Sequence, residues 1–189
     1  MTGDSLRERS KARRRDAILT AAYELFAERG FDATSIADIA EAAEVSPRTV
    51  TLYFPTKLEL AMAHFNTFVD QLSAALRARP PGQGIIDAVE QWLREKADAP
   101  GKFDELHDRM LQANPQLKGL CRSRLTDAVQ DGARLLAEEQ GWREDAFAPR
   151  ILAATVASVI GELTHESEPG DLETAMAFIR AAAATLQPG

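Results

Sequence analysis

The side chains between Pro47 and Lys57 have the hydrogen-bonding chemistry needed to contact nucleic acid. Arg48 carries a planar guanidinium, which can donate two parallel hydrogen bonds to a guanine base edge. Thr51 can touch a thymine methyl group or a phosphate. Pro47 and Leu52 belong to the same short segment. Lys57 begins a further helix, where backbone N–H groups also favour phosphate. This spacing predicts a DNA-reading segment if a single helix presents it.

Two short helices, over residues 34–44 and 46–53, are expected to position these groups. Thr34 or Ser35 can cap the first helix, whose apolar residues recur at helical spacing. Ser46 can cap the second helix, with Pro47 at the first helical position. Val45, Val50 and Phe54 provide the packing face of the second helix. Two helices joined by so tight a turn predict a helix-turn-helix, whose second helix enters the DNA major groove.

The sequence around this motif resembles the TetR family of bacterial transcription regulators over roughly residues 10–65. The matching positions are Ile18, Leu19, Ala21, Ala22, Leu25, Phe26, Gly30, the run Phe31–Ala40, Val45, Ser46, Thr49, the run Tyr53–Lys57 and Leu60. The resemblance implies a DNA-binding head of three helices, followed by a helical body that binds an effector and forms a homodimer.

The resemblance also implies roles for individual residues in DNA binding. Thr34, Thr49, Tyr53 and Lys57 match positions that hold the DNA backbone in this family. Alternatively, Tyr53 belongs to the core or a cap, and Lys57 is a solvated charge. The predicted DNA-binding set is Thr34, Ser46, Pro47, Arg48, Thr49, Thr51, Leu52, Tyr53 and Lys57.

The chain departs from the family pattern at three of these positions. Arg48 stands where a small residue is frequent, Thr51 where an aromatic residue is frequent, and Leu52 where a polar or basic residue is common. These differences affect the expected operator sequence and leave the expected fold unchanged.

The charge of the 189-residue chain is unevenly distributed. The formal net charge is −7, yet residues 1–15 hold six Lys and Arg side chains against two carboxylates. This asymmetry predicts a basic arm on an acidic body, because binding phosphates requires cations. The alternative for residues 1 to about 8 is a disordered, solvated tail.

Other functional classes lack their signatures. The sequence has no apolar run of about eighteen residues and no secretory signal, which favours a cytoplasmic protein without membrane contact. It also has no phosphate-binding glycine loop, nucleophile elbow or zinc-protease motif, so an enzyme is not expected. The single cysteine, Cys121, predicts a core residue, and the histidines His64, His107 and His165 are too widely spaced in sequence for a metal site. No metal and no cofactor are expected.

Helical periodicity extends along the whole chain and predicts an all-α fold of about nine helices. We expect the helix-turn-helix domain at residues 1–57, a linking helix at 58–79, and an effector-binding and dimerisation domain at 80–189. The break at residues 80–84, Pro-Pro-Gly-Gln-Gly, is the clearest internal boundary. Further breaks predict helices at 85–97, 103–113, 116–140, 145–165 and 171–186.

The last two helices are predicted to form a dimer interface. Three small residues at spacing four offer a smooth face, and five apolar residues follow a seven-residue seam suited to helix pairing. The interface candidates are Ala153, Ala157, Gly161, Leu172, Met176, Ile179, Ala183 and Leu186. The alternative is that both helices merely complete the core of one chain.

The helices after the break are also expected to enclose an effector, which the resemblance implies is a small molecule. The candidate lining is mainly apolar and therefore predicts a largely apolar ligand. It comprises Phe65, Trp92, Phe103, His107, Met110, Leu111, Asn114, Leu125, Phe147, Ile151 and Thr155, with Ser158 as a further polar candidate.

Together these features predict a ligand-responsive regulator, most simply a repressor. It would bind a near-palindromic operator in double-stranded DNA as a homodimer, and the effector would release it. The alternative is a helical interaction protein whose head no longer reads a specific operator.

Overall fold

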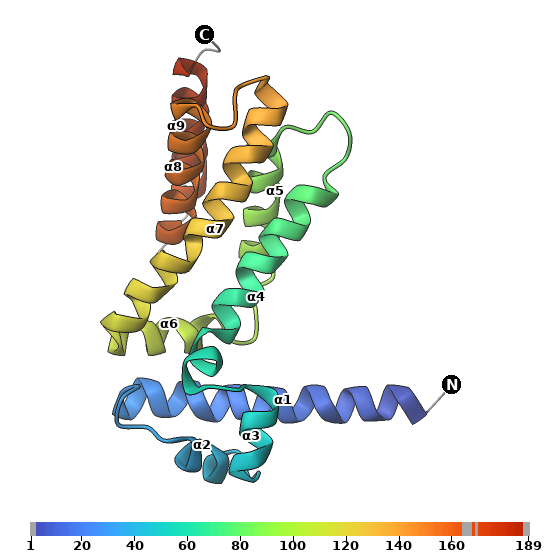
Figure 1. Ribbon diagram of the computed structural model, residues 1–189, viewed down its shortest axis with the longest axis vertical. Helices are drawn as coiled ribbons and strands as arrows, with labels where there is room; N and C mark the ends of the chain where they lie inside the picture. Colours follow the sequence, from blue (N-terminus) through green and yellow to red (C-terminus); the bar gives the residue numbers. More distant parts are fainter. Residues whose placement is uncertain (1–2, 164–167, 169, 187–189) are drawn as a thin grey trace. The chain divides into compact units, whose positions relative to one another are not determined.

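The structure is a computed structural model that describes residues 3–163, 168 and 170–186. Helices joined by turns and loops make up these residues, which confirms the predicted all-α class (Figure 1). The helices are α1 (Gly3–Arg29), α2 (Ile36–Ala42), α3 (Pro47–Tyr53), α4 (Lys57–Ala78), α5 (Ile85–Asp98), α6 (Asp104–Ala113), α7 (Pro115–Gln140), α8 (Phe147–Leu163) and α9 (Asp171–Thr185). None of these described helices is both long and apolar enough to cross a membrane.

Local sequence signals set most helix ends close to the predicted positions. Gly30 ends α1 in the left-handed conformation, with φ +86°, which costs glycine little because it has no Cβ. The helix α1 begins at Gly3, so the basic segment predicted at the start of the chain is helical from that residue, in contrast to the alternative of a disordered tail.

The helices pack into two compact units that do not follow chain order. The first unit comprises the chain up to Asn66 together with Lys102–Cys121, and the second comprises Thr67–Gly101 and the chain from Arg122 onward. The unit boundaries therefore fall inside α4, between α5 and α6, and inside α7, and none falls at the break at residues 80–84. Packing groups α6 with the N-terminal helices, which chain order alone does not indicate.

The core of the first unit surrounds α1. Ile18, Tyr23 and Phe26 of this helix are fully buried, and α2, α3, α4, α6 and the first turns of α7 supply further core residues. The helices α2 and α3 lie on one side of α1, and α6 lies on the other (Figure 1). Cys121 is buried in this core, as predicted for a small core residue.

The second unit packs α5, α8 and α9 against the later turns of α4 and α7. Its core includes Trp92, which meets the Phe68 ring edge-on at 4.8 Å between centroids. Surface ion pairs join α9 to α5: Arg180 contacts Asp87 at 2.7 Å and also Glu90.

Candidate nucleic-acid interface

Two side-chain caps fix the helix-turn-helix. Ser35 caps α2, and a reciprocal capping box with Asp38 satisfies two backbone N–H groups at the start of the helix. Hydrogen bonds from the side chain and backbone of Ser35 hold the pKa of Asp38 below its usual range. Ser46 caps α3 by accepting a hydrogen bond from the Thr49 N–H. Between the two helices, Glu44 adopts φ +53°, a left-handed conformation that no sequence signal indicated.

The outward face of α3 carries four of the predicted DNA-binding residues. Pro47, Arg48, Thr51 and Leu52 are all exposed, because Val50 is buried and anchors the opposite face in the core. Leu52 is 81% exposed, which is unusual for a large apolar side chain. These four side chains are at the first, second, fifth and sixth positions of α3, so helical geometry places them next to one another.

The remaining α3 candidates are partly engaged within the protein. The hydroxyls of Ser46 and Thr49 lie 2.8 Å apart and share a hydrogen bond. Tyr53 is half-buried and packs against the core of the first unit, as its alternative assignment predicted.

Thr34 has a structural role in place of the predicted contact with the DNA backbone. Its side chain is buried, and its hydroxyl lies 2.8 Å from the Gly30 carbonyl and 3.3 Å from the Leu25 carbonyl. A hydroxyl has one hydrogen to donate, so this group is already committed to the end of α1. The prediction for Thr34 is therefore revised.

Lys57 is also used inside the protein. Its Nζ atom donates to the carbonyls of Phe31 at 2.7 Å and Thr34 at 2.8 Å, and lies 3.4 Å from that of Asp32. The ammonium also lies 4.4 Å from the centre of the Phe31 ring. Because an ammonium has three hydrogens, these carbonyls account for all of them. Lys57 thus fixes the α1–α2 loop, and a phosphate contact is no longer assigned to it.

Asn114, predicted as an effector contact, connects α6 to the head. Its Nδ2 atom donates to the carbonyls of Phe26 and Met110, each at 2.8 Å, and its Oδ1 accepts from the Phe31 N–H at 2.6 Å. The side chain is 1% exposed. No sequence signal indicated this role, since its partners lie 83 and 88 residues away.

Five further effector candidates also belong to the first unit, one of them Phe65 on α4. Phe103, His107, Met110 and Leu111 pack around Tyr23 and the α1 core. The structure brings His64 and His107 to 4.9 Å between ring centroids, although they are distant in sequence. Among the residues that the structure describes, no three potential metal ligands gather at one point. Burial raises the pKa of the Tyr23 hydroxyl, which accepts a hydrogen bond from the His64 N–H.

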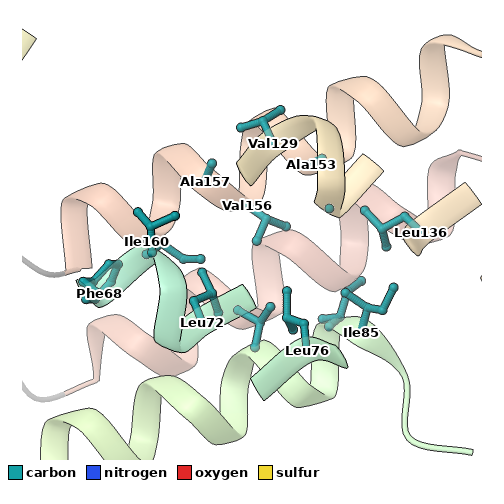
Figure 2. Close-up of a pocket in the computed structure, with 14 residues that line it drawn as sticks. Phe68, Leu72, Leu76, Ile85, Val129, Leu136, Ala153, Val156, Ala157 and Ile160 are labelled. Atoms are coloured by element: carbon teal, nitrogen blue, oxygen red, sulfur yellow. The ribbon is translucent and has the colours of Figure 1, made fainter. Parts of the chain in front are cut away.

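The second unit contains a cavity of about 60 Å³ lined by apolar residues only (Figure 2). Its walls come from α4, α5, α7 and α8. The lining residues are Phe68, Val69, Leu72, Leu76, Ile85, Ile86, Val89, Val129, Gly132, Leu136, Ala153, Val156, Ala157 and Ile160. None of the predicted effector residues lines this cavity, but two predicted interface residues, Ala153 and Ala157, do.

The other effector candidates lie outside the cavity lining. Trp92 is buried, Phe65 is half-buried, and Phe147 and Ile151 are exposed on α8. The Thr155 hydroxyl donates to the Ile151 carbonyl within the helix. Leu125 lies outside the described side chains, and His165 lies outside the described residues.

The predicted dimer seam on α9 faces the core of its own chain. Met176 and Ile179 are buried, and Leu172, Ala183 and Leu186 pack against the same core. Met176 and Ile179 therefore complete the core of one chain, whereas the half-buried Leu172, Ala183 and Leu186 stay predicted interface residues. Larger apolar side chains remain exposed elsewhere on the same two helices, namely Phe147, Ile151 and Phe178.

Comparison with known proteins supports the architecture described above. Residues 18–63 match the family described as bacterial regulatory proteins, tetR family. The transcriptional regulator TcmR of Streptomyces glaucescens is 30% identical over 98% of this chain and 88% of its own length. NalD of Pseudomonas aeruginosa, the secondary repressor of the MexAB-OprM multidrug efflux pump, superposes with a TM-score of 0.62 at 22% identity, covering 92% of this chain and 97% of NalD. The multidrug binding protein EbrR, solved with ethidium, gives a TM-score of 0.57 at 20% identity, covering 93% and 99%.

Proposed function

The chain belongs to the TetR family of bacterial regulatory proteins, and on that premise we propose that it is a repressor released from its operator by a small apolar molecule. Its relatives are DNA-binding transcription regulators rather than enzymes. The exposed face of α3 is the observation that carries the proposal. Because its partner is chromosomal DNA, the proposed place of action is the cytoplasm.

Arg48 and Leu52 are the proposed specificity residues. Arg48 occupies the second position of α3 and is exposed, so its guanidinium can meet the O6 and N7 atoms of guanine. Leu52 lies one turn further on and has no polar atom, which suits the methyl group of thymine. The outward face would therefore read a guanine and a thymine in each half-site.

The test is selection from a pool of genomic fragments by the purified protein, with the retained DNA sequenced. Arg48→Ala should reduce operator affinity about 5- to 150-fold relative to random DNA, as expected for a bidentate contact worth about 1–3 kcal/mol. Arg109→Ala, an exposed arginine on α6, is the control and should leave specificity unchanged. If the retained fragments share no sequence, the protein does not read a specific operator. That result would favour the alternative, a helical interaction protein, in which the exposed Leu52 does not contact DNA bases.

The apolar cavity of the second unit is the proposed effector site. Its lining offers neither charge nor hydrogen-bonding side chains, so the effector should be uncharged and mostly hydrocarbon. A volume of about 60 Å³ is far below the roughly 300–1,000 Å³ of typical ligand pockets. A ligand of ordinary size must therefore push its walls apart.

Ligand entry would act on DNA binding through α4. Phe68, Leu72 and Leu76 of this helix line the cavity, whereas Leu60 and Met62 of the same helix lie in the core of the first unit. A ligand that displaces the later turns of α4 can therefore favour a different arrangement of the head. The ligand can change the free-energy difference between the two arrangements by no more than the difference between its binding free energies for them.

The uncharged dye N-phenyl-1-naphthylamine is a suitable probe of this site. Its fluorescence should rise on binding, and Ala157→Leu should suppress the rise by filling the cavity. Ala74→Leu, an exposed position on α4, is the matched control and should bind the dye normally. Equal binding by both variants would place the dye elsewhere and refute the assignment.

We propose a homodimer formed through the exposed faces of α8 and α9. Phe178 lies on the opposite side of α9 from Arg180, whose ion pairs hold the helix to α5. Phe147 and Ile151 are exposed on α8, which packs against α9. Two such faces would form a four-helix interface and place two α3 helices about 34–36 Å apart on DNA.

Sedimentation velocity of Phe178→Glu tests this interface. The variant should sediment as a monomer, because a buried carboxylate without a partner is costly. Leu120→Glu, a similar change at another exposed apolar residue, is the control and should leave the dimer intact. A dimeric Phe178→Glu protein would rule out this face.

A further inference from the structure

The segment that joins α4 to α5 lies at one end of the apolar cavity. Figure 2 shows Phe68 and Ile160 toward one end of the cavity, and Ile85 and Leu136 toward the other. Ile85 is the first residue of α5, and residues 79–84 connect it to α4. We call residues 79–84 the strap. The strap therefore borders the site that we assign to the effector.

The strap contains a preformed turn. The carbonyl of Pro80 accepts a hydrogen bond from the Gln83 N–H at 3.1 Å, and Gly82 adopts φ +88°. Pro81 followed by a glycine at positive φ is the pattern of a type II turn. Because the proline ring also fixes a backbone angle, the turn keeps its shape and moves as one piece. The contacts at its two ends therefore decide whether it opens.

Arg79 attaches the strap to α4. Its Nη1 atom donates to the Leu76 carbonyl at 2.8 Å, and its Nε atom donates to the Gln83 carbonyl at 3.2 Å. The first bond satisfies a carbonyl in the last turn of α4, where the helix itself offers no partner. Both bonds stay within the strap and the helix that precedes it, so they preserve its shape without fixing it to α7.

Glu139 attaches the strap to α7. Its carboxylate accepts a hydrogen bond from the Ile85 N–H at 2.8 Å and lies 3.8 Å from the Arg79 guanidinium. Gly84 is the N-cap residue of α5 and has no side chain to cap the helix, so Glu139 supplies a cap from another helix. The side chains of Arg79 and Glu139 are 22% and 24% exposed, so water can replace these contacts.

We propose that the strap is the entrance of the cavity and that Glu139 is its latch. When the bond from the Ile85 N–H breaks, the strap and the first turn of α5 can move away from Leu136, which lies one turn before Glu139 on α7. Elsewhere the walls are packed apolar side chains, and separating them exposes hydrocarbon to water. Opening the latch instead exchanges hydrogen bonds within the protein for hydrogen bonds to water, which costs less. This inference rests on the proposed effector site.

Stopped-flow fluorescence with N-phenyl-1-naphthylamine measures how fast a ligand enters and leaves. Glu139→Ala should raise both rate constants about tenfold, since a factor of ten equals about 1.4 kcal/mol, within the net contribution of one hydrogen bond. The dissociation constant should stay the same, because the latch closes with and without ligand and slows passage in both directions. Glu139→Gln keeps an acceptor for the Ile85 N–H, so its rate constants should rise less.

Asp131→Ala is the matched control, because it also removes one carboxylate from α7. Asp131 pairs with Arg77 and so joins α7 to α4 next to the lining residue Gly132. Its loss should leave both rate constants unchanged. If Asp131→Ala speeds dye exchange as much as Glu139→Ala does, or if Glu139→Ala leaves the rate constants unchanged, the strap is not the entrance.

A crosslink keeps the test decisive if Glu139→Ala loosens the whole second unit. A Cβ atom added at Gly84 would lie 3.6 Å from the Oε1 atom of Glu139, so the two positions are within reach of each other. Gly84→Cys with Glu139→Cys, joined by a short bis-maleimide, should reverse the roughly tenfold gain in both rate constants. The wild type, whose Cys121 is buried, should be unaffected by the reagent. Unchanged exchange after crosslinking would overturn the proposal.

The proposed effector site is judged separately, by dye binding at equilibrium. If Ala157→Leu binds the dye as well as the wild type does, the dye occupies another site, and the effector assignment fails together with the latch. If Ala157→Leu blocks binding but Glu139→Ala leaves the rate constants unchanged, the latch alone fails.

Discussion

Replacing Asn114 tests whether its amide holds α6 against the head. Asn114→Ala removes three hydrogen bonds, from the Phe31 N–H and to the carbonyls of Phe26 and Met110. The Phe26 carbonyl keeps a second partner, the Gly30 N–H at 3.1 Å. Two backbone groups, the Phe31 N–H and the Met110 carbonyl, therefore lose the side-chain partner that satisfies them.

The expected loss follows from these two groups. A buried polar group left without a partner costs about 1–3 kcal/mol, and the Phe31 bond is only partly buried. We therefore expect the free energy of unfolding to fall by about 2–4 kcal/mol. At roughly 2–4 °C per kcal/mol, the melting temperature should fall by about 4–16 °C. Amide exchange at Phe31 should become faster, because its acceptor is gone.

Urea unfolding and calorimetry measure the effect, with Gln112→Ala as the control. Gln112 is exposed on the same helix, so its truncation should cost less than about 0.5 kcal/mol. If Asn114→Ala is as stable as Gln112→Ala, the structural role assigned to Asn114 is refuted. A stable variant with altered effector binding would restore the original prediction for this residue.

Three further predictions concern the loop, the surface ion pairs and the end of α1. Lys57→Met should lower stability by about 1–3 kcal/mol in urea unfolding, with an unchanged salt slope for DNA binding; a smaller slope would restore a phosphate contact. Hydrogen bonds from Arg94 and Arg180 lower the pKa of Glu90. These bonds therefore stabilise the folded protein fully above about pH 4.3, and the stabilisation is lost as the pH falls through the lowered pKa. Glu90→Gln should therefore cost up to about 1 kcal/mol at pH 7 in urea unfolding, and a gap that stays constant down to pH 3 would contradict this. Gly30→Ala should lower the stability by about 1–2 kcal/mol in thermal unfolding, because alanine is strained at this positive φ. A steric clash does not contribute, since the added Cβ meets nothing closer than 3.8 Å. An unchanged melting temperature would contradict this strain.

Local sequence determined the helices and the reading face. Ser35 and Ser46 are caps whose partners lie three residues away, and Gly30 ends α1 through its own backbone freedom. Val50 is buried and Arg48 exposed because helical spacing puts them on different sides of α3. Such signals act over one or two turns, so they can be read from one sequence.

Only the tertiary structure decided which partner each polar or apolar side chain meets. Thr34 and Lys57 have the residue types of phosphate contacts, yet carbonyls brought close by folding use their hydrogens. Met176 and Ile179 have the spacing of a dimer seam, and the same spacing equally fits the core of one chain. Periodicity shows that a helix has an apolar side but not what covers it, because that depends on contacts between residues far apart in sequence.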